Sequence, residues 1–225
     1  KALTSLANKV FAPVKPMVDR HVDTFKQLEF SIDLTNPHFP EKATLSQEII
    51  SITGTKNQNW IGIAPFAQYE SKVYPIDLMQ EVIDGLAENK NYKIFLFGGG
   101  EREIKLLNQL QNQHENVIVL AGKLKFKQEL DVISNLDTML SMDSGNAHIA
   151  AMLGVKVITL WGATHPYAGF KPFNQPDDFC LTSDREKYPL LPTSIYGNKK
   201  VEGYADVMRT ILPSQVIEKI NSNLT

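Results

Sequence analysis

From residue 60 onward, short apolar runs alternate with longer segments in which hydrophobic residues recur at helical spacing. Short runs bounded by polar residues are typical of buried strands, and the longer segments are typical of helices that cover a sheet. The runs that predict strands are residues 60–64, 93–97, 117–120, 138–141, 156–160 and 179–182. Because strands that alternate with helices form parallel sheets, the pattern predicts an α/β fold, a Rossmann-like parallel sheet with helices on both faces.

Four segments have the periodicity of amphipathic helices. They are residues 75–87, 126–136, 146–153 and 204–221. Pro75 suits the first turn of the first helix, because that position needs no backbone N–H. Gly154 follows the third helix at the position where a left-handed cap is usual. Pro213 is expected to interrupt the fourth helix, because proline removes a hydrogen bond from a helix interior.

Residues 1–59 follow a different pattern. They have a helical start, a polar stretch with Pro37 and Pro40, and a candidate helix near residues 44–50. They do not complete a strand–helix unit, so they are either a leader or linker, or the tail of a preceding domain. The first residue is Lys1 and not Met, which favours an excerpt from a longer chain. We expect residues 1–59 to be the tail of an absent N-terminal domain with its linker, and residues 60–225 to be the folded domain.

Charge and cysteine content exclude several classes of protein. The chain has 225 residues with 23 Lys and Arg against 25 Asp and Glu, so no basic field indicates binding to nucleic acid or to an anionic membrane. Its longest uncharged stretch, residues 157–170, is shorter than the roughly 18 residues that a membrane-spanning helix needs. Cys180 is the only cysteine, so the chain has no internal disulfide, which fits a reducing cytoplasm.

The segment richest in candidate chemistry is residues 141–151, where the fourth predicted strand gives way to a helix. Asp143 or Ser144 could cap this helix, and Gly145 would let a ligand approach the backbone. The exposed N–H groups and the positive end of the helix dipole favour a phosphate. His148, one turn into the helix, would point back toward the same crevice. The alternative is an ordinary capped helix with a hydrogen-bonded histidine.

A glycine-rich junction at residues 97–103 invites comparison with the dinucleotide-binding fingerprint. Gly98 and Gly100 would be its first two glycines, but Glu103 occupies the third position, so NAD binding is not supported. The carboxylates of Glu101 and Glu103 could still accept hydrogen bonds from ribose hydroxyls. The alternative is a plain turn.

Two further loops carry polar side chains that are candidates for ligand binding. Lys72 precedes the first helix, where its ammonium group could meet a diphosphate, although a lone lysine is more often a solvated surface charge. Thr164 and His165 lie in the loop 162–172 that follows a predicted strand. Hydrolase and metal sites are set aside, because Ser144 lacks the G-x-S-x-G frame and no H-E-x-x-H or H-x-H spacing occurs.

These segments occur in an order that resembles a known family. Residues 143–151 match Asp-(Ser/Thr)-Gly-x-x-His-x-Ala-Ala in full, and residues 65–75 match a Pro-x-Ala loop followed by Lys-x-aromatic-Pro, with Tyr74 in place of the usual tryptophan. The glycine-rich turn 98–103 and a Gly-x-Thr-x-Pro loop at residues 162–166 complete the series. Over about residues 60–211 the chain resembles the C-terminal donor-binding domain of glycosyltransferase family 9, the ADP-heptose:lipopolysaccharide heptosyltransferases.

The resemblance implies a GT-B architecture, in which two Rossmann-like domains enclose the active site, and it makes this chain the C-terminal half. It implies an inverting, metal-independent transfer of heptose from ADP-heptose to a lipopolysaccharide core acceptor, with no cofactor. The general base of the family is an aspartate early in the N-terminal domain, and nothing in this sequence matches it. We therefore expect residues 1–225 alone to be inactive in transfer.

The same resemblance implies a set of donor-binding residues. They are Lys72, Glu101, Glu103, Asp143, Ser144, Gly145, Asn146 and His148. Lys72 would offset the charge of the diphosphate, and one of the two glutamates would hold the ribose. Asp143, with the three backbone groups that follow it, would hold sugar and phosphate. His148 would support that loop.

The partners implied are a nucleotide-sugar donor and a lipid-linked oligosaccharide acceptor, with at most peripheral membrane contact and no nucleic acid. The corresponding location is the cytoplasm, at the inner face of the inner membrane. Two other functions stay open: a non-catalytic nucleotide-sugar-binding module, and another GT-B activity such as a sugar-nucleotide epimerase. The sequence leaves the sugar, the base, the acceptor and the oligomeric state open.

Overall fold

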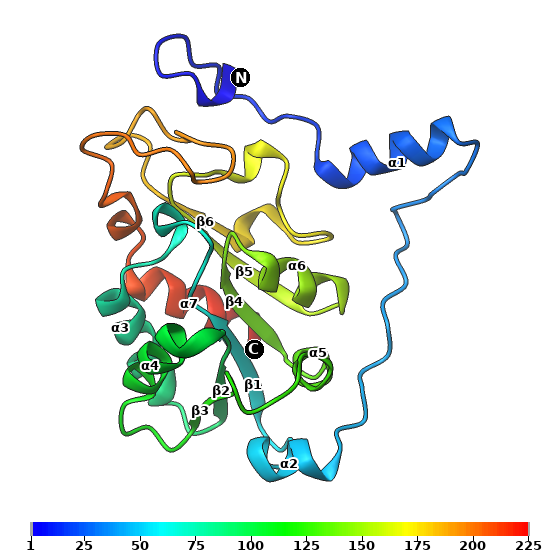
Figure 1. Cartoon of the computed structure of the whole chain (residues 1–225), viewed down its shortest axis with the longest axis vertical. Helices are drawn as coiled ribbons and strands as arrows, with labels where there is room; N and C mark the ends of the chain where they lie inside the picture. The colour runs from blue at the N-terminus through cyan, green and yellow to red at the C-terminus, as the bar shows by residue number, and fades with distance from the viewer. Residues whose placement is uncertain (1, 225) are drawn as a thin grey trace.

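A six-stranded parallel sheet forms the centre of the computed structural model, which describes residues 2–224 (Figure 1). Its strands are β1 (Asn59–Ala64), β2 (Tyr92–Leu96), β3 (Val117–Val119), β4 (Thr138–Met142), β5 (Lys156–Trp161) and β6 (Cys180–Thr182). Every predicted strand is present, and each of its ends lies within one residue of the prediction. The predicted α/β, Rossmann-like class is confirmed.

The strand order, β3-β2-β1-β4-β5-β6, places β1 between β2 and β4. Ile63 of β1 is in register with Leu96 on one side and with Leu140 on the other. The chain therefore builds one half of the sheet outward from β1 and then returns to build the other half from β4. In open parallel sheets, ligands bind at the carboxyl ends of the strands beside such a switch point.

Side chains alternate between two hydrophobic cores, one on each face of the sheet. In β1, Ile61 and Ile63 belong to the first core, and Trp60 and Ala64 belong to the second. The first core contains residues of α3 (Ile76–Ala87), α4 (Gly100–Gln111) and α7 (Pro213–Leu224). The second contains residues of α2 (Gln47–Thr53), α5 (Phe126–Ser134) and α6 (Gly145–Met152) (Figure 1). Helices thus cover both faces, as predicted.

The C-terminal helix differs from its prediction. Residues Val207–Thr210 form a 3₁₀ turn, and α7 begins at Pro213 without an interruption. Proline fits the first turn of a helix, where its missing N–H would have no helical partner. The helix predicted over residues 204–221 is therefore wrong in its first half. Gly154 has φ 76°, which confirms the left-handed cap after α6.

The N-terminal segment runs across the top of the sheet before it enters the fold (Figure 1). Its helix α1 (Met17–Gln27) lies later than the predicted helical start, after a 3₁₀ turn at Ala2–Thr4. We call residues 9–17 the N-terminal strap. The backbone N–H of Val14 donates to the carbonyl of Tyr167 at 2.9 Å, and that of Met17 donates to Gly169 at 2.8 Å. The strap is thus fixed to the loop that follows β5.

Within residues 2–224, none of the helices has both the length and the apolar character that a membrane crossing requires.

Candidate functional site

Asp143 lies directly after β4, at the switch point of the sheet. Its Oδ2 atom accepts a hydrogen bond from the Thr164 hydroxyl at 2.9 Å and lies 3.2 Å from the Nζ atom of Lys72. The side chains of Lys72 and Asp143 are only 13% and 9% exposed. Lys72 is therefore one partner of a largely buried ion pair and not a solvated surface charge.

Lys72 is held in place by contacts with two distant loops. It ends a 3₁₀ turn, Glu70–Lys72, in the loop between β1 and α3. The carbonyl of Ser71 accepts the N–H of Ala163 at 3.1 Å, and the Ser71 hydroxyl donates to the carbonyl of Gly197 at 2.6 Å. A Cβ atom at Gly197 would lie 2.7 Å from Cγ of Lys72, so glycine is needed for this close approach.

The start of α6 is not capped as predicted. Ser144 is the N-cap residue, but its side chain makes no capping hydrogen bond. Its hydroxyl is 3.2 Å from that of Ser141, and the contacts of Asp143 go to Lys72 and Thr164. The expectation that Asp143 or Ser144 caps the helix was therefore wrong. The positive end of α6 is left without a side-chain cap, which strengthens it as an anion site.

A cavity of about 240 Å³ lies at this point of the sheet edge. It is lined by Gln68, Lys72, Asp143, Ser144, Gly145, His148, Phe170, Ile195 and Tyr196. Burial lowers the pKa of His148; the Asp143 carboxylate opposes this effect, and the Lys72 ammonium adds to it. At neutral pH the cavity therefore combines an ammonium group, a carboxylate, an uncharged imidazole and a helix N-terminus.

Five of the eight donor-binding residues implied by the resemblance line this cavity, and three do not. Glu101 and Glu103 begin α4 after β2, further along the same sheet edge. Glu103 accepts the N–H of Gly99 at 2.8 Å, and Glu101 is exposed. Asn146 is half-buried on α6. The role of the glutamates toward ribose, and that of Asn146, stay predictions.

Four cavity residues carried no signal in the sequence analysis: Gln68, Phe170, Ile195 and Tyr196. The rings of Phe170 and Tyr196 lie 5.9 Å apart. Phe170 belongs to the loop 162–172 after β5, in which the sequence indicates Thr164 and His165 as polar candidates and no aromatic residue. Ile195 and Tyr196 come from a segment after β6 that contains no motif, so only the fold could have indicated them.

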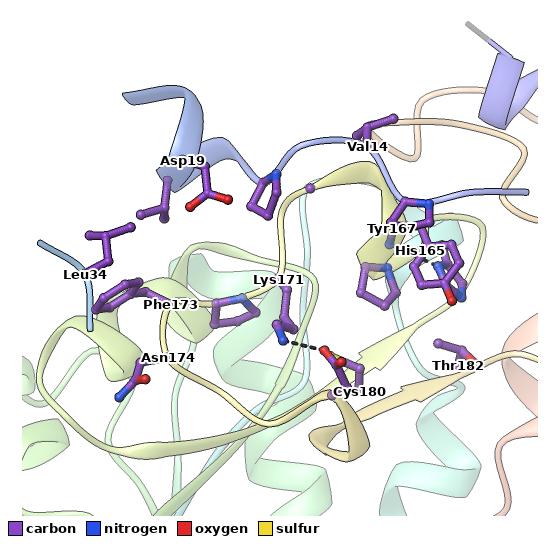
Figure 2. A pocket seen from close by; sticks show the side chains of 17 residues that line it. Val14, Asp19, Leu34, His165, Tyr167, Lys171, Phe173, Asn174, Cys180 and Thr182 are labelled. Atoms are coloured by element: carbon purple, nitrogen blue, oxygen red, sulfur yellow. Dashed lines mark hydrogen bonds and ion pairs between the residues drawn. The ribbon is translucent and has the colours of Figure 1, made fainter. Parts of the chain in front are cut away.

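A larger cavity, of about 590 Å³, lies between the N-terminal strap, α1 and the loop after β5 (Figure 2). Lys171 at its wall is paired with Asp177. His165 accepts the N–H of Tyr167, and its ring stands edge-on to Phe11 of the strap at 4.9 Å. Burial, with a smaller effect of the Arg185 guanidinium, lowers the pKa of His165 to about 4. The start of α1 also lines this cavity, but its first turn carries the Asp19 carboxylate, which disfavours an anion there. The smaller cavity is therefore the better match for a diphosphate.

Comparison with known proteins gives consistent results. The family model for glycosyltransferase family 9 (heptosyltransferase) matches residues 2–198. Lipooligosaccharide heptosyltransferase 2 of Haemophilus ducreyi is 28% identical over 193 residues, which are 81% of this chain and 52% of that protein. Lipopolysaccharide heptosyltransferase 3 of Escherichia coli is 31% identical over 110 residues, which are 48% of this chain and 32% of that protein. The chain spans about half the length, or less, of these curated relatives.

Solved structures share the fold. The E. coli heptosyltransferase WaaC with ADP superposes with a TM-score of 0.64 at 20% identity, covering 96% of this chain and 60% of that one. A family 9 glycosyl transferase from Veillonella parvula gives a TM-score of 0.69 at 21% identity, covering 94% and 60%. The family match covers well over half of the chain, and it includes both loops that form the Lys72–Asp143 pair. The chain belongs to glycosyltransferase family 9, the heptosyltransferase family.

Proposed function

We propose that this chain binds an ADP-activated heptose and supplies the donor-binding half of a GT-B heptosyltransferase. The observation that carries this proposal is the Lys72–Asp143 pair beside the start of α6, at the switch point of the sheet. An ammonium group and a helix N-terminus together form a site for a diphosphate. The names of the relatives, lipooligosaccharide and lipopolysaccharide heptosyltransferases, support heptose as the sugar.

The reaction breaks the bond between C1 of the sugar and an oxygen of the diphosphate, while an acceptor hydroxyl attacks C1 from the opposite face. The bonding electrons leave with the diphosphate. Lys72 and the first N–H groups of α6 would stabilise the charge that develops there, because they are already fixed before the reaction. The acceptor proton would pass to a general base, which the resemblance assigns to a facing N-terminal domain.

Asp143 would have two roles in this site. Its Oδ2 atom accepts the hydrogen bond of the Thr164 hydroxyl and pairs with the Lys72 ammonium group, so the carboxylate fixes the position of that ammonium group. Its Oδ1 atom could then accept a hydroxyl of the sugar. His148, uncharged at neutral pH, could donate one hydrogen bond to the phosphate or the sugar without adding charge.

The domain division and the acceptor belong to the same proposal. Residues 1–59 would connect the donor-binding domain, residues 60–225, to a facing domain, although Ile49 of α2 already packs in the second core. The acceptor would be a lipid-linked oligosaccharide of the lipopolysaccharide core, which requires at most peripheral contact with the inner face of the inner membrane. The lipopolysaccharide relatives support this acceptor class.

A thermal-shift panel of ADP, UDP, GDP and dTDP tests the donor site, because a ligand that binds only the folded state raises its melting temperature. We expect the largest shift with ADP, and a smaller one for Lys72→Ala. Equal shifts with all four nucleotides, or none, would contradict the proposal. A separate incubation with ADP-heptose in the absence of acceptor tests the epimerase alternative. Release of an altered sugar in that incubation would favour an epimerase.

A further inference from the structure

The elements around the proposed donor site lie in a fixed order along one edge of the sheet. Because the strands are parallel and ordered β2-β1-β4-β5-β6, the segments that follow them line the same edge in that order. Glu101 and Glu103 follow β2, Lys72 follows β1, and Asp143 follows β4. Phe170 comes after β5. Tyr196 follows β6 in the chain, but its turn returns to the loop after β1, where Gly197 contacts Ser71 and Lys72.

The chemistry changes along this edge. The β2 end carries carboxylates, which suit ribose hydroxyls. The middle carries the ammonium of Lys72 and the start of α6, which suit a diphosphate. Phe170, Ile195 and Tyr196 form an aromatic and apolar wall of the cavity that Lys72 also lines. A nucleotide sugar is also linear, with the diphosphate between nucleoside and sugar. If the ribose lies toward β2 and the diphosphate lies at Lys72, the sugar would lie against the aromatic wall.

The aromatic wall is fixed by the surrounding backbone. The N–H of Thr193 donates to Ala163 at 2.9 Å, and the N–H of Gly197 donates to the Ser194 hydroxyl at 2.9 Å. With the Ser71–Gly197 bond described above, these contacts hold the turn that carries Tyr196. The Tyr196 side chain nevertheless remains 60% exposed. A large ring on an anchored turn at the rim of a cavity has surface left for a ligand to cover.

We infer that Phe170 and Tyr196 form the wall that contacts the transferred sugar. This inference rests on the proposed function. A sugar ring has a face of C–H groups, and the electron-rich face of an aromatic ring attracts their partial positive charge. The sugar hydroxyls would meet Gln68 and Asp143 on the other walls of the cavity. The two rings therefore recognise the sugar and not the nucleotide.

The test is calorimetric titration of ADP and of ADP-heptose into the chain and into Tyr196→Ala and Phe170→Ala. We expect each alanine variant to bind ADP-heptose about threefold to tenfold more weakly, and ADP within about twofold of the parent chain. Tyr196→Phe keeps the ring and should bind ADP-heptose normally. Phe30→Ala is the matched control, because it removes an exposed ring of another ring pair, Phe25–Phe30, which lies outside the cavity.

The outcomes separate this inference from the proposed function. Equal weakening of ADP and ADP-heptose would place the rings against the nucleotide and overturn the inference alone. Unchanged binding of ADP-heptose by both alanine variants would also overturn it. If the parent chain binds neither ligand, the proposed function fails and the inference fails with it. Should Phe170→Ala not fold, Tyr196→Ala decides, because its side chain is mostly exposed and its loss leaves the cores intact.

Discussion

The hydroxyl of Thr164 donates a 2.9 Å hydrogen bond to the carboxylate of Asp143, which joins the loop after β5 to the loop after β4. Both residues are buried. A buried carboxylate needs such partners, because its desolvation is costly. The position of Asp143, and through it that of Lys72, therefore depends on a loop that belongs to a different strand.

Thr164→Val should weaken both folding and nucleotide binding. Valine has nearly the same shape, so the main loss is a hydrogen bond to a charged group, which is about 1.5 to 3 kcal/mol of unfolding free energy. ADP affinity should fall about threefold to tenfold, because Asp143 and Lys72 lose a fixed support. Urea unfolding and ADP titration measure the two effects. Thr164→Ser retains the hydroxyl and should behave like the parent chain; a similar loss of ADP affinity in both variants would contradict this role.

Lys72→Ala should destabilise the protein as well as impair binding, because the ion pair is largely buried. Removing one partner of such a pair leaves the other charge uncompensated, at a cost of about 3 kcal/mol. ADP binding should weaken about ten- to a hundredfold through loss of a charge-assisted phosphate contact. This differs from a solvated lysine, whose loss would change neither quantity.

The double variant Lys72→Ala/Asp143→Asn separates the two effects of Lys72. Asparagine carries no charge, so the double variant should recover most of the melting temperature that Lys72→Ala loses. It should not recover ADP binding. Recovery of both would show that Lys72 acts only through folding.

Gly197→Ala should displace the Lys72 side chain, because the new methyl group would overlap the lysine stem. Gly197 has φ 85°, and the added Cβ would meet the lysine stem at 2.7 Å from Cγ. Gly203 has φ 76°, but beyond its chain neighbours no atom of residues 2–224 lies within 4 Å of such a Cβ, so Gly203→Ala is a matched control. Both variants should lose about 1 to 2 kcal/mol of stability from the backbone conformation. Only Gly197→Ala should also weaken ADP binding in titration; equal ADP affinities of the two variants would argue against the contact.

His165 should make stability depend on pH below neutrality. Its pKa is about 4 in the folded protein, below the ordinary value near 6.5, so the unfolded chain takes up this proton first. Stability should therefore fall as the pH decreases from about 6.5 to 4, by about 3 kcal/mol from this group. His165→Asn keeps an acceptor for the Tyr167 N–H but does not titrate. Urea unfolding at several pH values should give a flatter profile for this variant; parallel profiles would refute the assignment.

The sequence predicted the sheet well because its central strands are buried. The central strands are mainly apolar runs between polar segments, and in β4 all five residues from Thr138 to Met142 are buried. The hallmark residues Asp143 and His148 were likewise found because a strand–helix junction with glycine has a recognisable pattern. The Lys72–Asp143 contact follows once β1 and β4 are known to be neighbours, which the sequence alone did not establish.

The parts that the sequence missed depend on long-range contacts. Tyr196 reaches the cavity because Ser71 and Ala163 hold its turn, and neither contact leaves a pattern near residue 196. The sequence predicts an interruption at Pro213 because the apolar periodicity continues on both sides of it. The N-terminal strap docks partly through backbone hydrogen bonds to residues 167 and 169, and backbone groups are the same in every residue.

The docking of the strap also constrains the order of folding during synthesis. Val14 and Met17 leave the ribosome long before Tyr167 and Gly169, the residues that accept their hydrogen bonds. Lys9 donates a hydrogen bond to the carbonyl of Pro192, which is synthesised later still. Contacts between residues so far apart in the chain form slowly. The strap is thus made well before it can dock, whereas Phe25, Leu28 and Phe30, which follow it in the chain, stay exposed even after it has docked.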